Sequence, residues 1–131
     1  MSVERFVYLD SSAIVKLVVR EPESRALLTS LRRRRLVSSA LARTEVTRAV
    51  LGSGADAVAR VADVLARIDL VRVSDRVLQV AGELLPAEMR SLDAIHVATA
   101  LLVGDVRRIV TYDERVARAA RAARLRVDAP R

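Results

Sequence analysis

Short β-forming runs alternate with longer helical patterns along the chain, and this alternation limits the folds that the chain can adopt. The runs that predict strands cover residues 6–9, 36–39, 70–73, 108–111 and 125–127. The patterns that predict helices cover residues 11–20, about 22–32, 40–51, 55–67, 75–86, 91–103 and 114–123. Strands that are separated by helices of this length usually lie parallel and are joined by right-handed crossovers. The sequence therefore predicts an α/β fold with a mostly parallel central sheet of four to five strands and helices on both faces.

Length and composition predict one globular domain over residues 1–131. Hydrophobic residues make up 52% of the chain and charged residues 30%, which is typical of a globular protein and not of a disordered one. The chain has no cysteine, so disulfides, thiolate catalysis and cysteine-bound zinc are excluded. The longest apolar stretch, Ala94 to Gly104, is too short to span a bilayer, and the N-terminus carries no secretory signal pattern. We expect a cytoplasmic protein with no membrane partner.

Basic residues outnumber acidic residues by 23 to 16, which gives the chain a net charge of +7. All of them except Lys16 are arginine, whose planar guanidinium group matches the geometry of a phosphate. A genome that favours arginine codons would explain the preference over lysine. The excess of positive charge itself indicates a polyanionic partner such as RNA, DNA or an acidic protein. The run Arg32–Arg35 is a candidate for phosphate binding beside an active site, or else it is a solvated helix end.

Four acidic side chains occupy positions where acids are uncommon. Asp10 directly follows the first predicted strand, and Asp113 follows the fourth. In parallel α/β sheets, ligands bind outside the carboxyl ends of the strands, which is where both aspartates fall. Glu45 lies on a helix face that is expected to point inward, and Asp93 opens a helix that is apolar nearly all round and is expected to be buried. Burying a charge is costly unless the charge is paired or bound to a metal, so the four acids together indicate a metal site.

Each acid also has an ordinary structural explanation. Asp10 and Asp113 stand where an N-cap residue of the following helix would stand. Asp93 lies in a first helical turn, where a carboxylate gains about 0.3–1 kcal/mol from the helix dipole. Glu45 has Arg48 one helical turn away as an ion-pair partner. The argument for a site therefore rests on the combination of the four acids.

That combination favours a bound cation. Two carboxylates ~4 Å apart repel each other by about 4 kcal/mol at an effective dielectric constant near 20, so a cluster needs protonation, arginine partners or a cation. Oxygen donors in a chain with no cysteine and one histidine select Mg²⁺ or Mn²⁺ over Zn²⁺. The histidine, His96, lies one helical turn from Asp93, and we expect it to support the site as a hydrogen-bonded residue rather than as a ligand. The number of ions, one or two, stays open.

Four stretches of the chain resemble the PIN-domain family and, within it, the VapC-type toxins of bacterial toxin–antitoxin pairs. These stretches are YLDSSAIVKL (8–17), ARTEVTRA (42–49), SLDAIHVATA (91–100) and VTYDERVARAA (110–120). They follow the family's order and extend over nearly the whole chain, and SLDAIHVATA is the most specific of them. The resemblance implies a single PIN domain over residues 1–131.

The resemblance implies a Mg²⁺- or Mn²⁺-dependent endoribonuclease, the toxin component of a type II toxin–antitoxin module, which hydrolyses RNA phosphodiesters with a metal-activated water. The residues that match the family's four acidic positions, and that would hold metal and carry catalysis, are Asp10, Glu45, Asp93 and Asp113. Ser12 and Thr111 match small hydroxyl positions and would support the acids by hydrogen bonding, or else serve only in capping and strand packing. The partners that the resemblance implies are an RNA substrate, a VapB-type antitoxin and either a second copy of the chain or a hetero-oligomer with the antitoxin.

Two other functions stay open: a housekeeping PIN-type RNA-processing nuclease and a non-catalytic α/β module that binds nucleic acid or regulates. Single-strand binders usually stack bases on aromatic side chains, and this chain has only Phe6, Tyr8 and Tyr112. A phosphorylation-dependent receiver domain would need a lysine late in the chain, where none is found. A phosphatase of the haloacid dehalogenase type would need an aspartate in place of Ser12. The sequence does not indicate which RNA would be cut.

Overall fold

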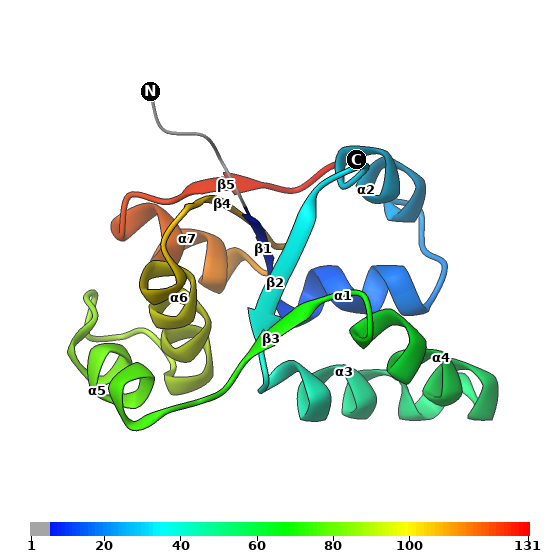
Figure 1. Ribbon diagram of the computed structural model, residues 1–131, viewed down its shortest axis with the longest axis horizontal. Coiled ribbons are helices and arrows are strands. Elements are labelled where there is room, and N and C mark those ends of the chain that lie inside the picture. Colours follow the sequence, from blue (N-terminus) through cyan, green and yellow to red (C-terminus); the bar gives the residue numbers. More distant parts are fainter. Residues whose placement is uncertain (1–5) are drawn as a thin grey trace.

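The computed structural model describes residues 6–131, and its centre is a sheet of five parallel strands (Figure 1). The strands are β1 (Phe6–Leu9), β2 (Arg35–Ser39), β3 (Asp69–Val71), β4 (Val106–Val110) and β5 (Arg126–Asp128). Their order across the sheet is β3-β2-β1-β4-β5. In this register, Tyr8 of β1 lies beside Val37 of β2 and Ile109 of β4. The α/β fold that the sequence predicts is confirmed.

Helices connect the strands and cover both faces of the sheet. They are α1 (Ser11–Val18), α2 (Ser24–Ser30), α3 (Ala42–Val50), α4 (Ala55–Leu65), α5 (Asp75–Glu83), α6 (Ser91–Val103) and α7 (Glu114–Ala122). In Figure 1, α1, α3 and α4 lie on one side of the sheet, and α5, α6 and α7 lie on the other. A short 3₁₀ turn over Leu51–Ser53 joins α3 to α4.

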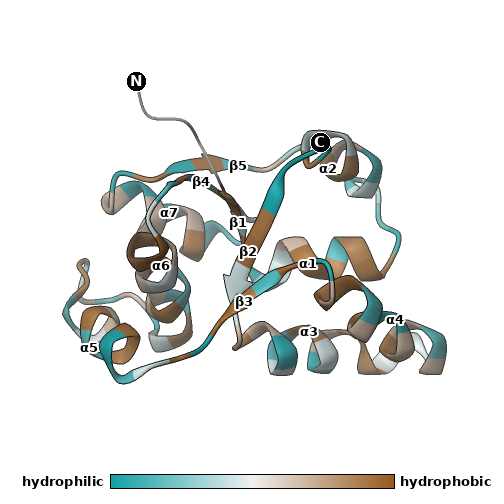
Figure 2. Cartoon of the chain, viewed as in Figure 1, coloured by the Kyte–Doolittle hydropathy of each residue, from teal (hydrophilic) through white to brown (hydrophobic). Residues whose placement is uncertain are grey.

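Two hydrophobic layers, one on each face of the sheet, form the core. Successive residues of a strand point to opposite faces, so Val7 and Leu9 of β1 enter one layer and Tyr8 enters the other. All three side chains are fully buried. Figure 2 shows the hydrophobic character of β1 and the mixed character of the outer helix α4. Parallel strands that are covered on both faces form continuous apolar runs, which explains why the sequence of β1 predicts a buried strand.

Helix α6 is less buried than its composition predicts. Its central residues pack against the sheet, α5 and α7. The side chains of Leu92, Leu101 and Leu102 are nevertheless 48%, 39% and 36% exposed, because they lie at the two ends of the helix, while residues 96–100 between them are buried. Although α6 is strongly apolar, neither it nor any other helix between residues 6 and 131 is long and apolar enough to cross a membrane.

The parallel sheet has two edges of different chemistry, one at the carboxyl ends of its strands and one at the amino ends. The carboxyl ends of β1 and β4 lie side by side, which brings Asp10 and Asp113 to the same edge. The run Arg32–Arg35 leads into β2 and lies at the amino edge. The hypothesis that this run binds phosphate beside the acids is therefore wrong. All four arginines are exposed, as expected for a solvated helix end.

Candidate active site

Asp10 is the buried acid of the site. It directly follows β1 and is the N-cap of α1, where its Oδ1 atom accepts a hydrogen bond from the backbone N–H of Ala13 at 3.0 Å. The residue is only 2% exposed. Burial raises the pKa of the Asp10 carboxyl above its ordinary value, although hydrogen bonds from Thr111 and Ser12 act in the opposite direction. Asp10 therefore has a structural role as a cap, but it also keeps a carboxylate in an environment that disfavours its charge.

Two hydroxyl groups hold the Asp10 carboxylate in place. Ser12 donates to Oδ1 at 2.7 Å, and Thr111 donates to Oδ2 at 2.5 Å. The Thr111 hydroxyl also accepts a hydrogen bond from the backbone N–H of Asp113 at 3.0 Å, while its own bond to Asp10 links the ends of β1 and β4. Both hydroxyls thus hydrogen-bond to Asp10, as expected for residues that support the acids, and they fix the orientation of its carboxylate.

Asp93 and Asp113 form a pair of like charges between α6 and α7. Asp113 is the N-cap of α7 and accepts a hydrogen bond from the backbone N–H of Arg115 at 2.8 Å. Asp93 lies in the first turn of α6. Partial burial, followed by the negative charge of Asp113, raises the pKa of the Asp93 carboxyl, while His96 and Arg115 act to lower it. The two carboxylates are therefore close enough to repel each other.

Glu45 reaches the site from α3 and is held by two side chains. Its Oε1 atom accepts a hydrogen bond from the Ser11 hydroxyl at 2.6 Å and lies 2.7 Å from Nε2 of His96. Burial alone would raise the pKa of the Glu45 carboxyl, but the contacts with His96 and Ser11 outweigh it and leave this pKa below its ordinary value. The Glu45 side chain is 25% exposed, so it lies on the inward face predicted for this helix but its carboxylate still reaches solvent.

His96 connects Glu45 to the core through Tyr8. The Tyr8 hydroxyl lies 2.7 Å from Nδ1 of His96, and the two rings meet edge to face. Burial raises the pKa of Tyr8, so the phenol keeps its proton and can donate it to Nδ1. With Nδ1 as the acceptor, the proton on Nε2 is donated to Glu45. His96 has both ring nitrogens engaged, in agreement with a hydrogen-bonded supporting residue.

The sequence did not point to Tyr8, Ser11 or Arg115 as parts of the site. Tyr8 and Ser11 lie on either side of Leu9 and Asp10, at the end of the first strand. Their hydroxyl groups beside a strand end are the only feature of the sequence that could have indicated them. Their partners lie on α3 and α6, however, and only the packing of those helices reveals the contacts.

Asp10 and Asp113 follow neighbouring strands, and Asp93 is affected by the charges of Asp113 and Glu45, but the four acids form no closed cage. Within residues 6–131, no three carboxylate or imidazole groups lie close enough together to hold a metal ion by themselves. The donors are nevertheless all oxygens, which suit Mg²⁺ and Mn²⁺. Mg²⁺ usually keeps several waters and takes only one or two carboxylates directly, so the donor set fits an ion that is held partly through water.

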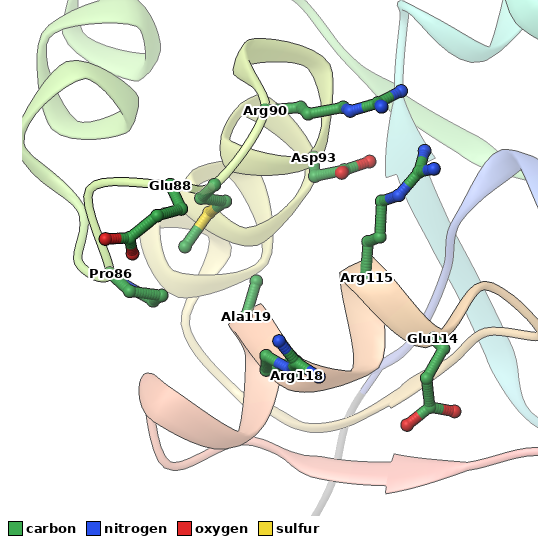
Figure 3. A pocket seen from close by; sticks show the side chains of 9 residues that line it. Pro86, Glu88, Arg90, Asp93, Glu114, Arg115, Arg118 and Ala119 are labelled. Carbon is green, nitrogen blue, oxygen red and sulfur yellow. The ribbon is translucent and has the colours of Figure 1, made fainter.

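A cavity of about 570 Å³ opens beside Asp93, between α7 and the segment that precedes α6 (Figure 3). The residues that line it are Pro86, Glu88, Met89, Arg90, Asp93, Glu114, Arg115, Arg118 and Ala119. The side chains of Arg90 and Arg115 extend toward the Asp93 carboxylate from opposite sides of the cavity. Basic groups at the site therefore come from these positions and not from the run Arg32–Arg35.

Residues 7–122 match the family model of the PIN domain. The chain belongs to the PIN-domain family. This PIN domain is 56% identical over 126 residues to Ribonuclease VapC46 of Mycobacterium tuberculosis, and the match covers 95% of this chain and 97% of that protein. The resemblance to the VapC group is thereby confirmed.

Two solved structures share the fold of this PIN domain. VapC20 of M. tuberculosis, described as a toxin that cleaves the sarcin–ricin loop, matches with a TM-score of 0.73 at 15% identity, over 86% of this chain and 94% of that chain. A toxin–antitoxin complex from Klebsiella pneumoniae matches with a TM-score of 0.70 at 16% identity, over 95% of this chain and 98% of that chain. At these identities the two structures support the fold alone.

Proposed function

We propose that this PIN domain is a Mg²⁺- or Mn²⁺-dependent endoribonuclease and the toxin of a type II toxin–antitoxin module. The observation that carries the proposal is that the negative charge of Asp113 raises the pKa of Asp93 at the edge where the buried Asp10 also lies. Such a group of acids in a chain of net charge +7 suits a cation and an anionic substrate. The name of the relative VapC46, a ribonuclease at 56% identity, supports RNA as that substrate.

The residues that would hold the ion, directly or through water, are Asp10, Glu45, Asp93 and Asp113. A divalent ion at this place supplies a water of lowered pKa and neutralises charge on the phosphodiester. Ser12 and Thr111 keep Asp10 in one orientation, so that no rotation is needed when substrate arrives. His96 and Ser11 do the same for Glu45.

In this mechanism no side chain attacks the phosphorus atom. Ser11 and Ser12 donate their hydroxyl protons to carboxylates, and His96 is held between Tyr8 and Glu45, so these groups orient acids instead of acting as nucleophiles. Water is then the nucleophile, and in-line attack leaves a 5′-phosphate and a 3′-hydroxyl end. The arginines beside Asp93 are placed to position the phosphate.

We further propose that the whole chain, residues 1–131, acts as one PIN domain in the cytoplasm and is neutralised by a VapB-type antitoxin. The similarity of its fold to a chain of the K. pneumoniae toxin–antitoxin complex supports this partner. Co-expression with the product of an adjacent short reading frame, followed by co-purification, tests it. A nuclease that no neighbouring gene product inhibits would instead be a housekeeping RNA-processing enzyme.

Incubation of the purified chain with a pool of total small RNA tests the catalytic proposal. Cleavage is expected with Mg²⁺ or Mn²⁺, no cleavage with chelator, and mapped cuts that carry 5′-phosphates. Asp93→Asn and Asp10→Asn are each expected to abolish cleavage, because a neutral amide lacks the negative charge with which the carboxylate attracts a divalent cation. Asp63→Asn, an exposed acid on α4, serves as the matched control and should cut normally. Full activity of both site variants would remove these acids from the mechanism.

A further inference from the structure

The cavity beside Asp93 is lined by three arginines to which the proposed chemistry of the acids gives no fixed role. Arg90 precedes α6, while Arg115 and Arg118 are one turn apart on α7. In Figure 3 the guanidinium groups of Arg90 and Arg115 both lie near the Asp93 carboxylate. The lining holds three arginines and three acids, so its formal charge is balanced overall, but two of the arginines lie near Asp93 while Glu88 and Glu114 lie apart from it.

Within residues 6–131, the guanidinium groups of these three arginines make no hydrogen bond and no ion pair within 4.0 Å, although the charge of Arg115 does lower the pKa of Asp93. Other arginines of the chain do have acidic partners: Arg108 lies 2.8 Å from Asp128, and Arg121 lies 3.4 Å from Glu114. An arginine without a partner keeps its planar set of donors available for a bidentate contact with phosphate. The cavity therefore offers donors that match a phosphate and that no hydrogen bond within residues 6–131 already occupies.

The same cavity has an apolar side that suits a sugar or a base. Pro86, Met89 and Ala119 contribute to its lining, and Met89 packs against the hydrophobic layer that contains Tyr8. The acids Glu88 and Glu114 extend away from the Arg90–Arg115 pair in Figure 3, so they do not cancel its charge. A volume of about 570 Å³ falls within the range of pockets that hold ligands of nucleotide size.

We propose that this cavity is a subsite for the nucleotide next to the cleaved phosphodiester: Arg90 and Arg115 bind its phosphate, and its base or sugar lies over Met89 and Ala119. The inference rests on the proposed ribonuclease function, because it is the position of Asp93 on the cavity wall that places a bound nucleotide beside the reacting phosphate. Arg118, farther along α7, would contact the next phosphate of the chain. A nucleotide site of this kind does not require stacking on aromatic side chains, in agreement with their scarcity in this chain.

Nucleotide binding to the isotope-labelled full chain, followed by NMR, tests the subsite without requiring catalysis. The probes are the four 5′-nucleoside monophosphates, with the matching nucleosides and inorganic phosphate for comparison. The nucleotides are expected to shift the backbone signals of residues 86–90 and 114–119, and to bind more tightly than either half of the molecule alone. Arg90→Gln/Arg115→Gln is expected to weaken binding by about tenfold or more, because charge-assisted hydrogen bonds are lost. Arg67→Gln, at an exposed arginine just after α4, should leave binding unchanged.

The outcomes separate the subsite from the catalytic proposal. Signals that shift elsewhere, or equal binding by the double variant and the wild type, would overturn the subsite even if the wild type cuts RNA with Mn²⁺. Absence of Mn²⁺-dependent cleavage by the wild type would instead overturn the function. Arg118→Gln alone keeps the test informative if the double variant does not fold, since it should weaken binding of a dinucleotide more than that of a mononucleotide. Tighter binding of an acidic peptide than of any nucleotide would assign the cavity to a protein partner and reject the proposal.

Discussion

At the scale of single residues, the site keeps charges that the fold would be more stable without. Asp10 is buried and its pKa is raised, and Asp93 and Asp113 repel each other across the gap between α6 and α7. The hydroxyls of Ser12 and Thr111 reduce the cost of burying Asp10 but leave its pKa above the ordinary value. Proteins usually keep such unfavourable charges at functional sites, and binding a cation is the function that fits this group of acids.

The variant Asp10→Asn is expected to be more stable than the wild type at pH 7 when chelator is present. The folded protein binds the Asp10 proton at a higher pH than the unfolded chain does, so the wild type gains stability as pH falls through this raised pKa. The neutral variant lacks this gain, and its advantage should shrink between pH 7 and acid pH. Thermal melting in chelator across this range measures the effect, with Asp63→Asn as the control. A variant that is less stable by the same amount at every pH would contradict the prediction.

The variant Tyr8→Phe is expected to make the Glu45 side chain less well ordered, although Tyr8 acts on it only through His96. It leaves Nδ1 of the buried His96 without its hydrogen-bond partner, which costs about 1–3 kcal/mol of unfolding free energy. A less firmly held imidazole orients Glu45 less well, and kcat should fall by about tenfold with little change in KM. Kinetics on a cleaved RNA together with denaturant titration measure both effects. Tyr112→Phe, which loses a hydrogen bond to the carbonyl of Pro130 instead, should keep kcat.

At the scale of helices and strands, the sequence predicts the existence and order of the elements well because each has its own periodicity. The run FVYL matches β1 at both ends, and the helix predicted over 91–103 matches α6. What the sequence could not supply is the direction of side chains between elements. The contact of Tyr8 with His96 joins residues 88 positions apart, and the position of Arg32–Arg35 at the amino edge follows from the pairing of β2 with β1. Such facts depend on register and packing, which no local pattern contains.

Helix α1 carries the first acid of the site, and its packing is expected to depend strongly on Ile14. That side chain is fully buried in the layer that α1 shares with α2, α3 and α4. Ile14→Ala should lower the unfolding free energy by about 2–5 kcal/mol, because the lost methyl groups leave a cavity that the surrounding helices fill only in part. Leu28→Ala, at a position that is 59% exposed, is the matched control and should cost much less. Urea denaturation measures both, and equal losses would mean that α1 is not anchored in this way.

At the scale of the whole molecule, the net positive charge and the acidic edge of the sheet both affect how RNA approaches the protein. A net charge of +7 attracts RNA from any direction, while the acids would repel it unless cations and arginines lie beside them. The cavity next to Asp93 is where the structure places arginines and an acid on the same wall. The general attraction and the local arginine contacts should therefore differ in how they respond to salt.

Salt titration of RNA binding distinguishes the two contributions. In an Asp10→Asn background, which prevents cleavage in the proposed mechanism, a short labelled oligoribonucleotide of mixed sequence should bind more weakly as salt rises from about 50 to 200 mM. Each arginine that neutralises a phosphate of single-stranded RNA contributes about 0.7 to the slope of log affinity against log salt. Arg90→Gln/Arg115→Gln should therefore reduce the slope by about 0.7 for each of the two arginines, whereas Arg67→Gln should change it little. An equal reduction by both variants would mean that only the overall charge attracts RNA, because a local contact is lost in the double variant alone.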